Sequence, residues 1–155
     1  MKLFTIILSC LLLICYSCKS KNNGQDQNGM NIRIELFTSD MEKSVHFYTT
    51  VLGFTMQGSK LNPSYQPVKQ GNVTIGIGPL AKLSNDHHFN PDHKNVQKGY
   101  GAEIVLEVEN VKRLYEKVKS SGYPIREPLV MQAWGLEDFR IVDSDGYYLR
   151  ITSKQ

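Results

Sequence analysis

Cysteine is absent from most of this chain. All three cysteines, Cys10, Cys15 and Cys18, lie within the first 18 of its 155 residues. The remaining 137 residues therefore contain no disulfide, no thiolate metal site and no cysteine nucleophile.

A surplus of one charge is also missing. The chain has a formal charge of +3, but three of its 18 basic and one of its 15 acidic residues precede Met30. The other 15 basic and 14 acidic residues nearly balance. Because a nucleic-acid-binding surface needs clustered positive charge, this composition predicts no nucleic-acid partner.

No hydrophobic run is long enough to span a bilayer as a normal helix. Residues 3–14 are apolar except for Thr5 and Ser9, and Lys2 gives them a positive start. Such a run is shorter than the roughly 20 residues of a spanning helix, and its pattern is typical of a secretory signal. A buried N-terminal strand or helix is the alternative.

The end of this segment resembles a bacterial lipobox, in which a cysteine is lipidated and becomes the new N-terminus. Cys18 follows the small residue Ser17, although Cys15 stands where leucine is usual. We therefore expect a lipoprotein signal at 1–18, a flexible polar tether at 19–29 and a folded domain at 30–155. A lipid anchor would hold the domain at the bacterial cell envelope, on the periplasmic side or the outer surface. Ordinary secretion with cleavage nearby is the alternative.

The folded part contains a repeat. Residues 32–37 alternate as a strand does, with Ile32, Ile34 and Leu36 on one face, and a helix follows that Ser39 or Asp40 caps and Gly53 ends. Residues 102–108 alternate in the same way, and the next helix runs from Asn110 to Gly122.

Each helix is followed by three segments that read as strands. They cover residues 54–59, 65–70 and 72–78 in the first copy, and 125–131, 138–142 and 147–152 in the second, with a hairpin turn at 145–146. The sequence therefore predicts an α+β fold of two βαβββ modules, whose curved, open mixed sheet surrounds a cleft.

Two stretches resemble a known superfamily. ELFTSDMEKSVHFYTTVLGF at residues 35–54 and WGLEDFRIVDSDGYYLR at 134–150 are similar to the opening and closing motifs of the vicinal oxygen chelate superfamily. That superfamily contains glyoxalase I, bleomycin-resistance proteins and extradiol dioxygenases. The resemblance covers about residues 30–153 and implies the same paired βαβββ modules.

The resemblance also implies where a metal would bind. Catalytic members hold a divalent ion with His, Gln or Glu side chains at four positions, which here correspond to Arg33, a residue near Ile75, Glu103 and Arg150. A guanidinium has no lone pair for a metal, and one carboxylate is too few ligands. We therefore expect no metal and no other cofactor.

Arg33, Glu103 and Arg150 are expected to meet where the metal would lie. They could form a structural ion cluster, or their surplus positive charge could bind an anionic group of a ligand. Aromatic walls are expected from Phe37, Tyr148 and Trp134, while Phe139 suits the core equally well. Glu35 and Glu107 complete the expected cleft and could act as acid–base groups if they were desolvated.

The four histidines give a weaker signal. His46 is expected on the exposed side of the first helix, and His87, His88 and His93 cluster in the segment between the modules. Such spacing could bind a transition metal, but a solvated polar loop is the commoner reading.

Three functions remain open at this stage. The leading hypothesis is a metal-free, sequestration-type domain that is tethered to a membrane and binds a partly aromatic small molecule, for which an anionic group is one option. The resemblance also leads us to expect a homodimer. The second is a lyase, isomerase or dioxygenase that depends on a divalent metal. The third is an interaction lipoprotein whose own side chains fill the cleft.

Overall fold

The computed structural model describes residues 32–87, 89 and 98–154. These lie in one compact unit, Ile32–Gln155. The predicted signal, Cys18, the tether, His88 and His93 fall outside the described residues. Within the described ranges, no helix is long and apolar enough to cross a membrane.

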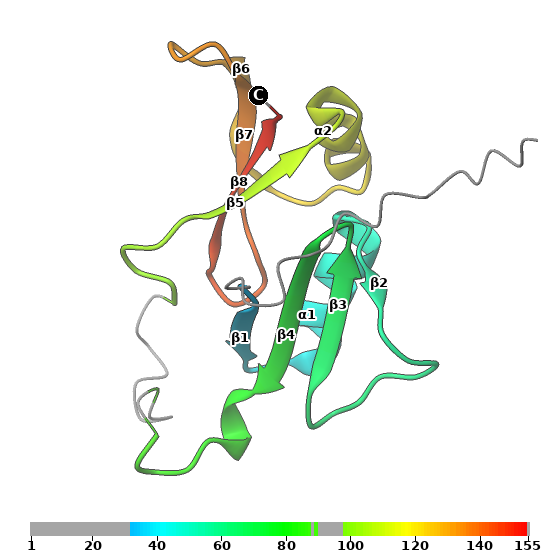
Figure 1. Ribbon diagram of the computed structural model, residues 1–155, viewed down its shortest axis with the longest axis vertical. Coiled ribbons are helices and arrows are strands. Elements are labelled where there is room, and N and C mark those ends of the chain that lie inside the picture. The colour runs from blue at the N-terminus through cyan, green and yellow to red at the C-terminus, as the bar shows by residue number, and fades with distance from the viewer. Residues whose placement is uncertain (1–31, 88, 90–97, 155) are drawn as a thin grey trace, which may run out of the picture. The chain divides into compact units, whose positions relative to one another are not determined.

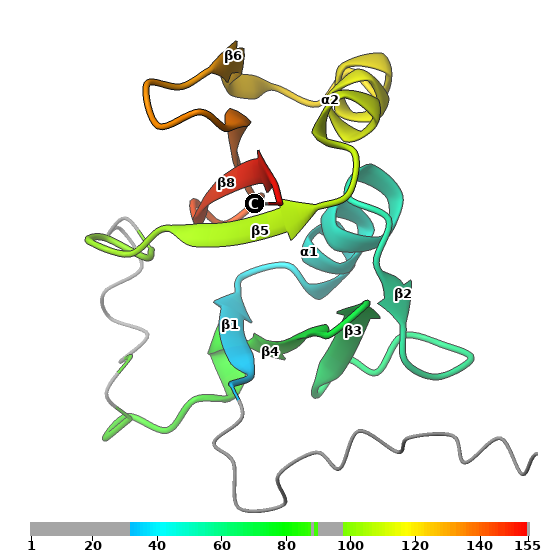
Figure 2. The same cartoon turned by 45° about the horizontal axis from the view of Figure 1, so that its top comes forward.

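The first module is a four-stranded mixed sheet with one helical segment (Figures 1 and 2). Its strand order is β1-β4-β3-β2, with β1 parallel to β4 and the other pairs antiparallel. The elements are β1 (Ile34–Thr38), α1 (Met41–His46) with a π-helical continuation (Phe47–Val51), β2 (Thr55–Met56), β3 (Gln66–Gln70) and β4 (Val73–Pro79).

The second module repeats this plan. Its order is β5-β8-β7-β6, with β5 parallel to β8 and the other pairs antiparallel. The elements are β5 (Ile104–Val108), α2 (Val111–Ser120), β6 (Ile125–Met131), β7 (Glu137–Val142) and β8 (Tyr148–Ser153). The predicted α+β class and the two βαβββ modules are confirmed.

Side-chain caps start both helices. A carboxylate oxygen of Asp40 accepts a hydrogen bond from the backbone N–H of Lys43 at 3.0 Å, and the Asn110 oxygen accepts one from Arg113 at 2.9 Å. The Ser39 hydroxyl donates instead to Asp145, so Asp40 is the cap of the two predicted candidates. The predicted single first helix changes to π-helical geometry at Phe47, where the Thr49 hydroxyl donates to the Val45 carbonyl.

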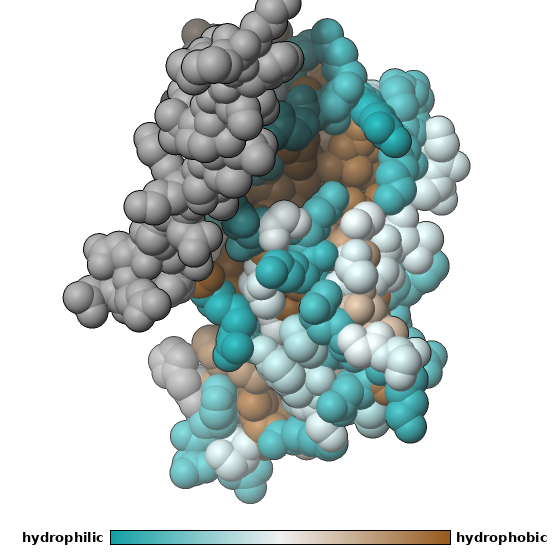
Figure 3. Space-filling model, turned by 45° about the vertical axis from the view of Figure 1, so that its right-hand side comes forward, coloured by the Kyte–Doolittle hydropathy of each residue, from teal (hydrophilic) through white to brown (hydrophobic). Residues whose placement is uncertain are grey.

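Each helix lies against one face of its own sheet, and the core forms there. Alternate strand residues point into it, as the period of two requires; its fully buried aliphatic members include Val68, Ile75, Ile77, Ile141, Leu149 and Ile151. Ile32 was predicted on this face but precedes β1 and is 89% exposed. On the side drawn in Figure 3, hydrophobic residues gather in a hollow between hydrophilic ones.

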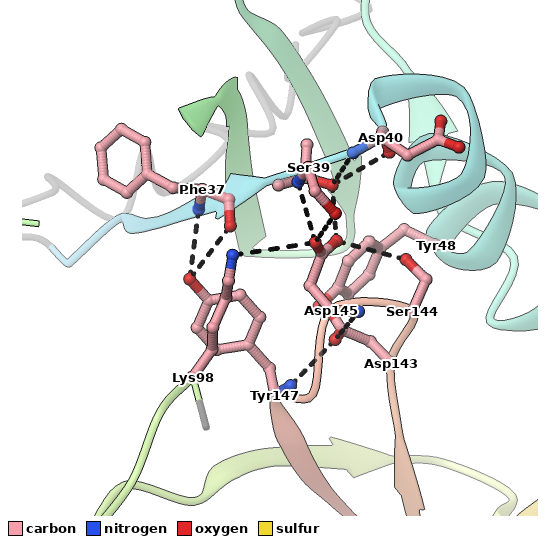
Figure 4. Close-up of polar contacts among 10 residues, drawn as sticks. Phe37, Ser39, Asp40, Tyr48, Lys98, Asp143, Ser144, Asp145 and Tyr147 are labelled. Atoms are coloured by element: carbon pink, nitrogen blue, oxygen red, sulfur yellow. Dashed lines mark hydrogen bonds and ion pairs between the residues drawn. The ribbon is translucent and has the colours of Figure 1, made fainter. Parts of the chain in front are cut away.

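The predicted turn between β7 and β8 ties the modules together (Figure 4). One Asp145 oxygen accepts from the Thr38 hydroxyl at 2.5 Å, and the other accepts from the Ser39 backbone N–H at 2.9 Å. Asp143 accepts from the Tyr48 hydroxyl at 3.0 Å and from two backbone N–H groups of its own turn.

Burial raises the pKa of the Asp143 carboxyl, and the hydrogen bonds that it accepts only partly offset this rise. The hydrogen bonds of this turn hold the start of β8, the strand that carries Arg150.

Candidate functional site

The register of the second sheet brings charged side chains together on its open face, the one away from α2. Arg140 in β7 is paired with Arg150 in β8, and Asp138 is paired with Thr152. The residues between them, such as Phe139 and Ile151, are fully buried in the core. Because strand side chains alternate between faces, the charged residues must lie opposite the core.

Five of these side chains form a network, which we call the ion cluster: Glu103, Glu127, Asp138, Arg140 and Arg150. Arg140 lies 2.9 Å from Asp138, 3.1 Å from Glu127 and 3.6 Å from Glu103. Glu103 also lies 3.3 Å from Arg150. Burial lowers the pKa of Arg140, but these three carboxylates raise it by more than burial lowers it. Its guanidinium therefore stays charged.

The predicted triad is wrong in one member. Arg33 lies directly before β1 of the first sheet, where its Nε is 2.5 Å from a Glu35 oxygen and its guanidinium is 5.9 Å from the centre of the Tyr65 ring. Its side chain is 61% exposed. The arginine that contacts Glu103 together with Arg150 is Arg140.

Sequence reasoning missed Arg140, although a signal was present. The predicted hairpin turn at 145–146 joins two strands, and counting back from it places Arg140 opposite Arg150. The four family metal positions do not include Arg140, so the resemblance alone gives no reason to expect it in the site.

The residues at the metal positions do not fit a divalent ion. Ile75 is wrong as the fourth position, because its side chain is fully buried in the core. The next residue of β4, Gly76, lies on the open face, where an added Cβ would lie 2.2 Å from a Glu35 oxygen. Two guanidiniums and a glycine offer no ligand atom, and Glu103 is engaged by two arginines. Within the described residues, no group of three or more His, Cys, Asp or Glu side chains is placed to hold a metal.

Trp134 lies at the edge of the ion cluster. It is 55% exposed, and the Arg150 guanidinium is 6.0 Å from its ring centre. The Tyr148 hydroxyl donates to Glu127 at 2.8 Å. Burial and this hydrogen bond raise the pKa of Tyr148, so the phenol remains neutral. The structure thus brings Trp134, Tyr148, Glu103 and Arg150 together, as predicted.

Three other predicted site residues lie apart from this group. Phe37 and Glu35 belong to the first sheet, where the Phe37 ring contacts the rings of His87 and Phe89 at 5.7 and 5.5 Å. Glu107 is exposed on β5, paired with Thr152 in the sheet. Phe139 is a core residue and packs edge-on against Tyr115 at 5.2 Å.

The ion cluster leaves two buried polar atoms without a hydrogen-bond partner in the described structure. They are one Asp138 carboxylate oxygen and Arg150 Nε, whose 3.3 Å approach to Glu103 lacks hydrogen-bond geometry. Such atoms are uncommon in folded proteins and often mark a place that water or a ligand occupies.

Comparisons with known proteins agree with this architecture. Residues 32–151 match the family model of the Glyoxalase/Bleomycin resistance protein/Dioxygenase superfamily. The lactoylglutathione lyase of Escherichia coli O157:H7 is 27% identical over 124 residues, which cover 77% of this chain and 89% of the relative.

Two solved structures share the fold at low identity. TioX from Micromonospora sp. ML1 superposes with a TM-score of 0.65 at 18% identity, covering 82% of this chain and all of that one. A lactoylglutathione lyase from Agrobacterium tumefaciens gives a TM-score of 0.62, also at 18% identity, over 81% and 93%. These two likenesses support the fold alone. With the family match across most of its length, the chain belongs to the glyoxalase/bleomycin resistance protein/dioxygenase superfamily.

Proposed function

We propose that this protein binds a small molecule without a metal, on the open face of its second sheet. One observation carries the proposal: the positions where the fold offers metal ligands hold Arg33, Gly76, Arg150 and a Glu103 that two arginines already engage. If Glu103 turned to a metal, the Arg150 guanidinium would lose its ion-pair partner within the described residues and would repel the bound cation beside it.

The expected ligand has an aromatic part and a neutral or cationic polar group. The exposed Trp134 ring offers a face for stacking. The case for an anionic ligand assumed that Arg33 joined this face. Since Arg33 lies elsewhere, the ion cluster has three carboxylates against two guanidiniums, a formal surplus of one negative charge. Glu127, whose side chain is 50% exposed, is an acceptor that a donor group of the ligand can reach.

The matched relative's name favours a second candidate, a lactoylglutathione lyase or another metal-dependent enzyme of the superfamily. The chemistry of the four positions counts against it. We therefore retain it as the outcome that bound metal would support.

Trp134 supplies a direct test, because it is the only tryptophan in the chain. We would titrate the full-length protein with 4-nitrobenzylamine, 4-nitrobenzyl alcohol and 4-nitrobenzoate, which share a quenching ring and differ in charge. The proposal predicts saturable quenching by the cation or the alcohol, and weaker quenching by the anion. Arg140→Met and Tyr148→Phe should weaken binding, whereas Arg113→Gln, an exposed change on α2, should not.

Quenching that rises linearly with the concentration of every probe, without saturation, would indicate collisional quenching alone. That result would contradict the proposal. Saturable quenching strongest for the anion, and unaffected by Arg140→Met, would contradict the assignment of the ion cluster to the site.

We also propose that the protein forms a homodimer. In the described part of each sheet, β1 and β5 are edge strands that pair on one side only. An exposed strand edge has backbone N–H and C=O groups that can pair with another chain, and a second copy could cover both edges. Light scattering should give twice the chain mass, while a monomer at micromolar concentration would contradict the expectation.

Finally, we propose a lipid anchor at Cys18, based on the lipobox-like sequence. Cys18→Ala should move the protein from the membrane fraction to the soluble fraction. If the variant still sediments with membranes, the lipoprotein assignment is wrong. Neither result changes the proposed ligand site.

A further inference from the structure

A hollow distinct from the ion cluster lies beside the start of β6 and the end of β7. It has a volume of about 590 Å³, within the range of ligand-binding pockets. Its lining residues are all different from those of the ion cluster: Lys43, Tyr123, Pro124, Ile125, Arg126, Val142, Asp143 and Ser144.

One wall of the hollow is apolar and fixed. The Tyr123 ring lies 4.8 Å from the Phe47 ring of the first module, and its hydroxyl donates to the Val142 carbonyl at 2.9 Å. Burial raises the pKa of Tyr123 to about 12, so the phenol is uncharged at neutral pH. Ile125 and Val142, both partly buried, extend the wall. This surface suits a hydrocarbon or aromatic group.

Two cations on the hollow are not neutralised. Lys43 and Arg126 are exposed, and neither side chain forms an ion pair or hydrogen bond within the described part of the chain. Asp143 is the only acid in the lining. Its oxygens already accept the Tyr48 hydroxyl and two backbone N–H groups of the turn.

Three other exposed cations have acidic partners, whereas others, such as Lys60 and Arg113, form no ion pair within the described residues and do not line this hollow. Arg33 pairs with Glu35, Lys112 with Glu137 and Lys154 with Glu109. Two free cations from different modules, Lys43 on α1 and Arg126 on β6, thus line one apolar hollow. That combination attracts a molecule with an apolar body and a negatively charged group.

We propose that this hollow is a second binding site, for a small amphipathic organic anion. The apolar body lies on Tyr123, Ile125 and Val142, and a carboxylate, sulfonate or phosphate group lies near Lys43 and Arg126. The two sites then differ in ligand charge: the ion cluster suits neutral or cationic groups and the hollow suits anions. This second site does not depend on the function proposed for the first.

Two fluorescent probes with the same aromatic body provide the test. The sulfonate 8-anilinonaphthalene-1-sulfonate is the anion, and N-phenyl-1-naphthylamine is its neutral counterpart. We would titrate both into the full-length protein, into Lys43→Gln/Arg126→Gln, and into Lys60→Gln/Arg113→Gln. The last variant removes one exposed lysine and one exposed arginine elsewhere, so it controls for net charge.

Lys43→Gln/Arg126→Gln should weaken binding of the sulfonate about tenfold, as the loss of two partly exposed charge contacts implies. Its affinity for the neutral probe should change less than about twofold, and added salt should weaken only the sulfonate. Backbone amide shifts in the NMR spectrum of the unsubstituted protein should cluster at Tyr123, Ile125, Arg126 and residues 142–144 when the sulfonate binds.

Either of two results would overturn the proposal. One is equal weakening of the sulfonate by both double variants, which would indicate a general charge effect. The other is amide shifts that cluster around Trp134 or within residues 1–31, which would place the probe on the ion cluster or on the N-terminal segment. The NMR map decides even if a variant fails to fold.

Discussion

The two modules share a strand plan and a parallel first-to-last strand pair, yet they fill the open faces of their sheets differently. The first sheet carries an exposed pair, Arg33 with Glu35, and two glycines, Gly76 and Gly78. The second carries the ion cluster, in which the Asp138 side chain is fully buried and that of Arg140 is 13% exposed. The same arrangement of strands therefore carries an exposed ion pair and two glycines on one open face, and a network of charged side chains on the other.

The difference predicts unequal stability effects when one arginine is removed from each face. Arg140→Met leaves Asp138 buried without its cation and should lower the free energy of unfolding by about 3 kcal/mol. Arg33→Met removes an exposed pair and should cost less than about 0.5 kcal/mol. Urea unfolding would measure both; equal losses would show that the second face is not distinct.

The double variant Arg140→Met/Asp138→Leu sharpens this test. If an unpaired buried charge causes the loss, removing that charge should recover most of it. A double variant no more stable than Arg140→Met would assign the loss to packing instead.

The glycines of the first face allow a matched test of close approach. At Gly76 an added Cβ would lie 2.2 Å from Glu35 and 2.3 Å from the Tyr65 hydroxyl, whereas at Gly78 the nearest atom is a Phe37 carbon at 3.5 Å. Gly76→Ala should displace these side chains and break their 2.9 Å hydrogen bond, at a cost of about 1 kcal/mol. Thermal unfolding should show Gly78→Ala nearly unchanged; similar losses for both would contradict the described face.

Asp143 gives a pH dependence at the contact between the modules. Because burial raises its pKa in the folded protein, its contribution to stability is present below the unfolded pKa and is lost as pH rises through the folded pKa. Asp143→Asn keeps one acceptor oxygen and removes this titration. The stability of Asp143→Asn relative to the unsubstituted protein should therefore increase from pH 3 to pH 7. A relative stability that falls over that range in denaturant titrations would contradict the sign.

Trp134→Ala should have only a small effect on stability. The side chain is 55% exposed, so its removal should change the free energy of unfolding by less than about 0.5 kcal/mol. It should nevertheless weaken binding of 4-nitrobenzyl alcohol, measured by equilibrium dialysis because the fluorophore is gone. Unchanged binding would remove Trp134 from the site.

The fold could be predicted from the sequence because its signals are local. The alternation of apolar and polar residues indicates the strands. Asp40 and Asn110 cap the starts of the helices. Gly53 and Gly122, both with positive φ, follow their ends. Element bounds were placed within a few residues, except that β2 is only two residues long.

The site could be predicted only in part, because it depends on which strands are neighbours. Glu103 and Arg150 met as expected, but Arg33 did not, since it lies on the other sheet. The fourth metal position was assigned one residue too early: in β4 the isoleucines alternate with glycines, and burial of Ile75 and Ile77 sends Gly76 and Gly78 to the open face.

We propose that the open face of the second sheet holds an ion cluster in place of a metal. The most direct test is elemental mass spectrometry of the full-length protein and of Glu103→Ala, each incubated with Zn, Ni, Mn and Fe(II) and then desalted. If Glu103 binds arginines rather than a metal, as we propose, the metal content of both should agree within about a tenth of an equivalent. Close to one equivalent in the unsubstituted protein that is lost in Glu103→Ala would contradict it and favour a metalloenzyme.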